Sequence, residues 1–308
     1  MSFRTLKFVN YIKHTKNFPT RAFSSRHSLC PDLVRPDDRH LAIIGNKWKL
    51  QSSPLFIGDF EPSGGSFQTR SLISRCEDAR FAIWGGSLTM NKIHPLLKRK
   101  KSLSLNRSDV LLLLVSQKVE ILRPFYEELL LHQPIYTMSE FTNCSKKSFS
   151  MKNILYKEEG NIELGSVEVL ILIADKVSRR VIDLPESYVK DFEGLGLSLQ
   201  EKGPPRVPLP EVPADAFDHT IKTQYRHTDF YRHVNNKECI SWAYDGLYES
   251  GVDPGTLKVK QIEVQNLKEL DSHQIVTQKV WINKKENLIN AIITYENKPV
   301  TYTKLMYY

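Results

Sequence analysis

Much of the chain consists of short segments in which apolar residues alternate with polar ones or form compact apolar runs, as in β-strands. Such segments lie at 109–122, 128–141, 146–156, 165–175, 217–226, 256–267, 273–283, 287–297 and 299–308. Helical spacing of apolar residues occurs at 79–98 and at 234–248. The residues that would form the buried face of the second helix are Cys239, Trp242, Ala243, Gly246 and Leu247. Many strands with few helices predict an α+β fold.

The body of the chain reads as two halves with the same order: a short extended segment, a helix and then several strands. Segment 116–136 also parallels 259–281, since each runs strand, acidic turn, strand, which favours an internal duplication. Between the halves, residues 194–213 contain five prolines, which cannot continue a helix or a central strand. We therefore expect an irregular N-terminal segment over 32–66, a first domain over 67–190, a proline-rich linker over 191–216 and a second domain over 217–308.

The first 31 residues differ from the rest in charge. They contain six basic residues and no acidic residue, among Ser, Thr and scattered apolar residues, which is the composition of a mitochondrial transit peptide. The sequence TRAFSS at 20–25 resembles a matrix-processing site, with cleavage near Phe23 and Ser24. We therefore expect residues 1–31 to direct the protein to the mitochondrial matrix. A disordered basic tail is the alternative.

Composition argues against several classes of protein. The net charge is +8 at pH 7, and because six positive charges fall in residues 1–31 the body is close to neutral. Charge therefore gives no reason to expect nucleic-acid binding. No apolar run reaches the ~18 residues of a membrane-spanning helix. The four cysteines lie far apart without a C-x-x-C pair, which predicts neither a zinc site nor a dense disulfide framework. We expect no metal and no cofactor.

Residue types suited to catalysis gather in the sequence YRHTDFYRHVNNKECISWAYDGL at 225–247. A polar turn carrying Asp229 and His233 leads into the predicted helix, which has Asn235 and Asn236 at its start. A helix N-terminus offers backbone N–H groups without intrahelical partners and the positive end of the helix dipole. Such amides could polarise a carbonyl oxygen while the carboxylate attacks the carbonyl carbon or activates water. This combination suits acyl chemistry.

At these residues the chain resembles the hotdog-fold thioesterases. Their signature is an acidic residue, three further residues and then H-V-N-N at the start of the central helix, and here Asp229 is followed by HVNN at 233–236. Over most of 67–308 the chain is most similar to the acyl-ACP thioesterases, which carry two hotdog repeats. The runs that support this are KVEILRPFYEELLLHQPIYT, VLILIADKVSRRVIDLP and LKELDSH. The resemblance implies tandem hotdog folds, each an antiparallel sheet wrapped around a central helix.

The same resemblance implies roles for individual residues. Asp229 matches the family's catalytic aspartate, His233 its active-site histidine, and Glu269 a functional glutamate. Asn235 and Asn236 match the pair that opens the helix and would contribute to substrate binding. From the residues alone, a structural role remains open for each of them, since carboxylates and asparagines are common at helix N-termini.

Two positions depart from the family pattern. Tyr231, also a candidate for substrate binding, stands where the plant enzymes have a catalytic asparagine. Leu270 stands where they have a cysteine, which excludes a cysteine nucleophile at that position. These departures favour a second hypothesis, a catalytically degraded double-hotdog protein that binds acyl groups or a protein partner without turnover. A third, a hydratase acting on enoyl thioesters, is disfavoured by the HVNN sequence.

The function implied by the resemblance is hydrolysis of acyl-ACP or acyl-CoA with release of a fatty acid in mitochondria, as part of fatty acid metabolism. The expected partners are the acyl thioester and an acyl carrier protein, and a homodimer is also open. The basic run at 96–102 would either meet an acidic carrier protein or be a solvated helix end. Cys239 is expected in the core, as a small apolar residue, and His227 at the surface.

Overall fold

The computed structural model describes residues 41–44, 47–51, 69–85, 110–127, 135–157, 162–175, 177–201, 203, 206–229 and 233–308. All of these belong to one compact unit. The transit peptide predicted at 1–31, the basic run at 96–102 and Tyr231 lie outside the described residues. No helix in the described part of the chain is long and apolar enough to cross a membrane.

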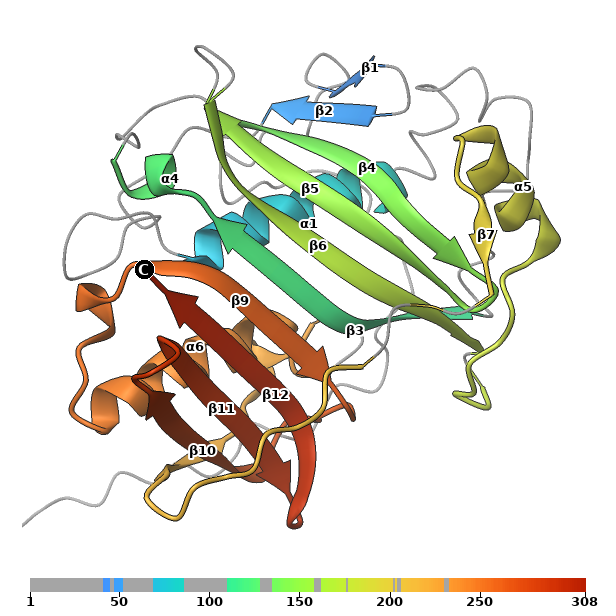
Figure 1. Ribbon diagram of the computed structural model, residues 1–308. Coiled ribbons are helices and arrows are strands. Elements are labelled where there is room, and N and C mark those ends of the chain that lie inside the picture. The colour runs from blue at the N-terminus through green and yellow to red at the C-terminus, as the bar shows by residue number, and fades with distance from the viewer. Residues whose placement is uncertain are drawn as a thin grey trace, which may run out of the picture. The chain divides into compact units, whose positions relative to one another are not determined.

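The strands of the described residues form one twelve-stranded sheet, most of which is seen in Figure 1. Their bounds are β1 Leu41–Ile44, β2 Lys47–Gln51, β3 Val110–Ile121, β4 Ile135–Ser145, β5 Ser148–Lys157, β6 Ile162–Asp175, β7 Leu199–Gln200, β8 Phe217–Lys222, β9 Val259–Asn266, β10 Ile275–Asn283, β11 Leu288–Tyr295 and β12 Lys298–Tyr307. Along the sheet the order is β1-β2-β4-β5-β6-β3-β9-β12-β11-β10-β8, with β7 beside β4. These strands pair antiparallel, except that β7 runs parallel to β4.

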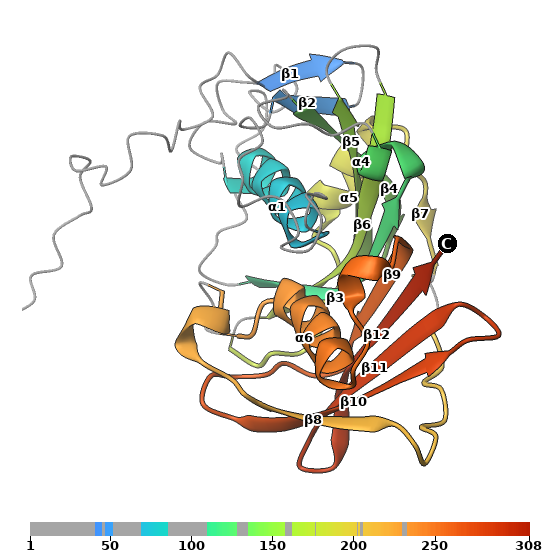
Figure 2. The ribbon, with the colours of Figure 1, turned by 90° about the vertical axis from the view of Figure 1, so that its left-hand side faces the viewer.

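The helices are α1 Thr69–Gly85, α4 Arg123–Glu127, α5 Glu186–Gly194 and α6 Asn236–Glu249, with 3₁₀ turns η3 Tyr225–His227 and η4 Pro254–Thr256. Helix α1 packs on β4 and β5, and α6 packs on β8, β9, β10 and β12. Figure 2 shows α1 and α6 on the same side of the sheet, and the two helices contact each other. The buried residues of α6 include all five that its spacing predicted: Cys239, Trp242, Ala243, Gly246 and Leu247.

The centre of the sheet is the pairing of β3 with β9. These strands pair antiparallel from Ser116 opposite Gln265 to Glu120 opposite Gln261. The earlier residues of β3 pair with β6, and a bulge interrupts that ladder between Leu114 and Ser116. On the N-terminal side of this bulge, the pairing of β3 with β9 does not continue. There the side chain of Asn266 donates from Nδ2 to the carbonyl oxygen of Leu114 (3.0 Å). The two central strands therefore part at this point, and the candidate site lies where they do.

Three expectations about the fold need correction. The two halves share one continuous sheet, because the exposed edge of β3 pairs with that of β9. The first helix covers 69–85, about ten residues before the predicted start, because charged residues interrupt its apolar face. The segment 32–66 is not wholly irregular, since β1 and β2 form a hairpin whose second strand pairs with β4.

The proline-rich region also contains regular structure at its start. Helix α5 ends at Gly194, and the two-residue strand β7 adds to the edge of β4. Farther on, the backbone N–H of Val207 donates to Gln265 Oε1 (2.8 Å), and Gln265 Nε2 donates to the Val207 carbonyl oxygen (3.1 Å). A buried side chain of β9 thus ties the described part of this segment to the sheet.

Candidate functional site

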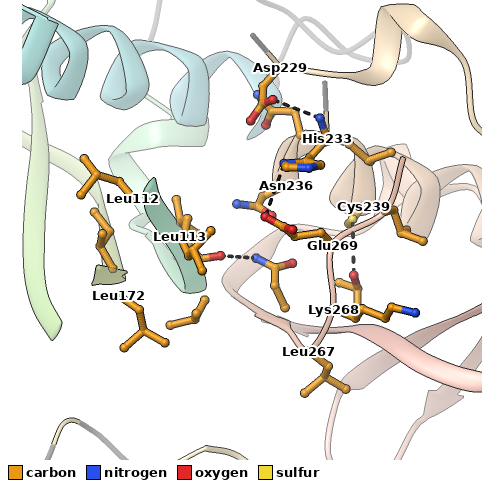
Figure 3. Close-up of a pocket in the computed structure, with 18 of the residues that line it drawn as sticks. Leu112, Leu113, Leu172, Asp229, His233, Asn236, Cys239, Leu267, Lys268 and Glu269 are labelled. Atoms are coloured by element: carbon orange, nitrogen blue, oxygen red, sulfur yellow. Dashed lines mark hydrogen bonds and ion pairs between the residues drawn. The ribbon is translucent and has the colours of Figure 1, made fainter. Parts of the chain in front are cut away.

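A pocket of about 350 Å³ lies where β3 and β9 part. Its walls come from both halves: Leu111–Val115 of β3 and Leu172 of β6 face the loop residues Asp229 and His233, the start of α6, and the segment 266–270. Figure 3 shows Leu112, Leu113 and Leu172 on one side and Asp229, His233, Asn236 and Glu269 on the other. One wall is therefore apolar, and the other carries the residues suited to chemistry.

Backbone hydrogen bonds hold Asp229 and His233 at the rim of this pocket. The N–H of Asp229 donates to the His233 carbonyl oxygen (2.8 Å), and the N–H of His233 donates back to Asp229 Oδ1 (3.3 Å). The next residue is anchored to the facing segment, because the N–H of Val234 donates to the Leu270 carbonyl oxygen (2.7 Å). The carboxylate thus has a fixed place beside the start of α6.

The two asparagines at the start of α6 have different roles. Asn235 is the N-cap: its Oδ1 accepts from the N–H of Lys237 (3.0 Å), and its backbone N–H donates to the His227 carbonyl oxygen (2.8 Å). Asn236 is the first helical residue and lines the pocket. Its backbone N–H has no partner among the described residues, as expected for the first amide of a helix. Among the described residues, Asn236 thus places a backbone donor without a partner at the start of α6, beside the pocket.

The imidazole of His233 lies among charged groups. Its Nδ1 is 3.4 Å from Glu269 Oε1, and its Nε2 is 3.2 Å from Arg179 Nη2. Arg179 also forms an ion pair with Glu269. The carboxylate of Asp271 lies farther away, with Oδ1 3.8 Å from Nε2. The structure thus brings Glu269 to His233, as the family resemblance implied, and adds Arg179, which the sequence analysis missed.

Cys239 lines the pocket but is unsuited to attack on a carbonyl carbon. Its side chain is 2% exposed and belongs to a small core with Trp242 and Leu270. Burial raises the pKa of its thiol to about 12, so the reactive thiolate is scarce at neutral pH. The expectation that Cys239 is a core residue is confirmed.

Replacing Cys239 by alanine should leave kcat for any turnover at this pocket within about twofold of wild type, because the neutral thiol supplies no charge. The lost sulfur should cost about 1 kcal/mol of stability by reducing buried apolar contact. Steady-state kinetics and urea unfolding of the purified variant measure the two effects. A large fall in kcat with unchanged stability would show that the thiol takes part in the reaction.

Two further positions from the sequence analysis have structural roles. Leu270 is buried in the core with Cys239, and its carbonyl oxygen holds the loop through Val234. His227 is half-buried: its ring and that of Trp242 meet edge to face with ring centroids 5.3 Å apart, and its Nδ1 accepts from the N–H of Gln224 (3.1 Å). Burial lowers the pKa of His227, which favours a neutral ring that shapes the turn before Asp229.

Within the described part of the chain, no three His, Cys, Asp or Glu side chains are grouped in a way that could hold a metal ion.

No protein-family model matches the sequence, and a search of curated proteins also gives no match. Solved structures do match. The 12:0-ACP thioesterase from Umbellularia californica aligns with 87% of this chain and 99% of its own, at a TM-score of 0.67 and 10% identity.

An acyl-ACP thioesterase from Bacteroides thetaiotaomicron aligns with 85% of this chain and 98% of its own, at a TM-score of 0.62 and 13% identity. The chain has the hotdog fold of the acyl-ACP thioesterases. Both alignments cover nearly the whole length of the known structures. In this hotdog fold, the acidic residue and the HVNN sequence lie directly before and at the start of α6, with the pocket beside them.

Proposed function

We propose that this protein is a thioester hydrolase that releases a fatty acid from acyl-ACP or acyl-CoA. The observation that carries the proposal is the placement of Asp229 and Asn236 around one pocket whose opposite wall is apolar, with the Asn236 N–H unpartnered among the described residues. The apolar wall is suited to the first part of an acyl chain, and the polar side is suited to the thioester. The resemblance of the fold to known acyl-ACP thioesterases supports the same reading.

The reaction requires a nucleophile at the carbonyl carbon and a donor at its oxygen. Asp229 either attacks the carbon, forming an anhydride that water then cleaves, or takes a proton from an attacking water. In both cases the C–S bond breaks, the carrier leaves as a thiolate that takes up a proton, and the acyl group leaves as a carboxylic acid. Negative charge develops on the carbonyl oxygen, where the Asn236 N–H and the positive end of α6 stabilise it.

We further propose that the chain is a tandem of two hotdog repeats, with the Asp…HVNN motif in the second. The elements β2-α1-β3-β4-β5-β6 are repeated in the same order by β8-α6-β9-β10-β11-β12. The strand order is also mirrored about the β3–β9 pair. Both facts support duplication, with a first repeat that begins at β2, earlier than the 67–190 expected from sequence, and a second repeat over 217–308.

A substrate panel tests the proposed activity. Purified protein that begins after residue 23 is offered acyl-ACP and acyl-CoA thioesters of increasing chain length, and release of free thiol is measured. We expect hydrolysis of at least one series, and the preferred series identifies the carrier. Sedimentation of the same sample gives the oligomeric state. Absence of hydrolysis across the panel would contradict the proposal.

A binding protein without turnover is the second candidate. It is favoured by Leu270, which stands at the family's cysteine position, and by the ion pair between Glu269 and Arg179. Retained binding of a fluorescent fatty acid, together with no hydrolysis across the panel, would identify this function.

We also propose that residues 1–31 direct the protein to the mitochondrial matrix, which their basic, acid-free composition supports. A reporter fused to these residues should enter mitochondria and be trimmed near Ser24. Replacing Arg4, Lys7, Lys13 and Lys16 by glutamate should abolish import, because a transit peptide must be basic. Import of the glutamate variant would show that the signal lies elsewhere.

A further inference from the structure

Arg179 reaches the candidate site from the first half of the chain. It lies in the turn that follows β6, whereas His233 and Glu269 belong to the second half. No pattern in the sequence links positions 179 and 269, which are 90 residues apart.

The turn is built so that Arg179 projects from a fixed backbone. The N–H of Arg179 donates to the Asp175 carbonyl oxygen (2.8 Å), and the N–H of Asp175 donates to the Arg180 carbonyl oxygen (2.9 Å). Asp175 Oδ1 accepts from the N–H of Ser178 (2.6 Å), and hydrogen bonds from Ser178 lower the pKa of that carboxyl. Arg179 itself has φ of 54°, a left-handed conformation that glycine adopts far more readily than arginine.

The contacts of the guanidinium determine which nitrogen of His233 carries the proton. Arginine is only a donor, so the Nε2 atom at 3.2 Å from Arg179 Nη2 must be the unprotonated acceptor. A ring with one proton then carries it on Nδ1, which faces Glu269 Oε1 at 3.4 Å, within ion-pair distance. The carboxylate of Asp271 is too far from Nε2, at 3.8 Å, to accept a hydrogen bond from it.

We propose that Arg179 is a positioning residue of this site, which holds His233 as the Nδ1–H tautomer and neutralises Glu269. Only the expected effect of Arg179 on the reaction rate rests on the proposed thioester hydrolysis. Arg179 and Glu269 contact the two nitrogen atoms of the His233 ring and so hold this residue in place. The backbone N–H of His233 in turn donates to the carboxylate of Asp229 and orients it. Glu269, paired with a cation, orients the ring and is not itself a base.

The rate test uses Arg179→Gly, because glycine suits the left-handed backbone of this turn and removes only the side chain. We expect kcat to fall about tenfold, equivalent to about 1.4 kcal/mol, with little change in KM and no loss of thermal stability. Arg179→Lys should recover part of the rate. Arg180→Gln is the matched control, since it removes the same charge one residue later in the same turn, and its kcat should be unchanged.

A double-mutant cycle tests the path of the effect. Because Arg179 acts through Glu269 and His233, adding Arg179→Gly to Glu269→Gln should lower kcat much less than it does in the wild-type protein. Wild-type kcat in Arg179→Gly, or full additivity with Glu269→Gln, would overturn the proposal.

A readout independent of activity separates this inference from the proposed function. Nitrogen-15 NMR of labelled protein distinguishes protonated from unprotonated imidazole nitrogens, and His233→Gln identifies the His233 signals by their loss. We expect Nδ1–H with bare Nε2 in the wild-type protein and a changed tautomer population in Arg179→Gly. If no thioester is hydrolysed, this result still decides the role of Arg179. An Nε2–H ring in the wild type, or identical spectra in the two proteins, would overturn it.

Discussion

Replacing Asp229 by asparagine should lower kcat for thioester hydrolysis by about 10³-fold, a loss of roughly 4 kcal/mol of transition-state stabilisation. The amide has almost the shape of the carboxylate but can neither attack a carbonyl carbon nor take a proton from water. Its oxygen can still accept the N–H of His233, the bond that closes the loop. KM should therefore change little, and stopped-flow and steady-state release of thiol measure both parameters.

Asp271→Asn provides the matched control. It makes the same chemical change near His233, but Asp271 is 67% exposed, and its carboxylate is 3.8 Å from the imidazole. Its kcat should stay within about twofold of wild type, since an exposed charge pair contributes little. Equal losses in the two variants would point to a general electrostatic effect, and full turnover by Asp229→Asn would remove Asp229 from the mechanism.

Gly165→Ala should be the most destabilising single-methyl change among the glycines of the described strands and helices. Gly165 is on β6, between β3 and β5, and a Cβ atom there would lie 2.3 Å from the Glu120 carbonyl oxygen. Because that oxygen is backbone, no side-chain rotation relieves the clash, and a strand must shift. We expect a loss of about 3 kcal/mol in the free energy of unfolding, at the upper end for overpacking.

Gly194→Ala is the corresponding control. It lies at the end of α5, and a Cβ there meets nothing within 4 Å. The added methyl group should be neutral or stabilise the protein by up to about 1 kcal/mol, by restricting the unfolded chain. Urea unfolding of both variants measures the difference. Equal stabilities would show that β6 and β3 can separate freely at Gly165.

The strands of the second half could be predicted closely from sequence because each is a short run rich in apolar and β-branched residues. The alternation over 287–297 and 299–308 corresponds to β11 Leu288–Tyr295 and β12 Lys298–Tyr307. Helix α6 was equally clear, since its buried residues other than Glu238 are apolar or glycine and its N-cap is an asparagine. The sequence pattern alone locates a strand or helix when its buried residues are mainly apolar and its exposed residues mainly polar.

The sequence analysis predicted the first helix too far along the chain, because some of the buried residues of α1 are charged. Arg75 and Arg80 are buried despite their charge. Charges also cross from α1 to α6, with Arg70 2.6 Å from Glu238 and Glu77 3.5 Å from Lys237. A periodicity argument assigns such residues to solvent, so the apolar stripe of α1 looks broken until the second helix is in place.

Some residues of the candidate site could likewise be predicted from the sequence, and one could not. Asp229 and His233 are four residues apart, and their closed loop could be inferred from the motif. Glu269 was placed there by family resemblance alone. Arg179 could not be found, because its contact depends on how a turn of one half meets a segment of the other. Long-range contacts without a motif require the folded structure.

The pairing of β3 with β9 has a consequence for any attempt to divide the protein. Separating the halves would turn each of these strands into a sheet edge with open hydrogen-bonding groups, which favours aggregation. One core cluster also mixes residues of both halves, including Leu72, Phe125, Ile262 and Leu305. A fragment covering 217–308 would therefore carry the motif but expose β9 and part of that core. A protease cut between 206 and 216 would instead yield two fragments that remain assembled through the β3–β9 ladder.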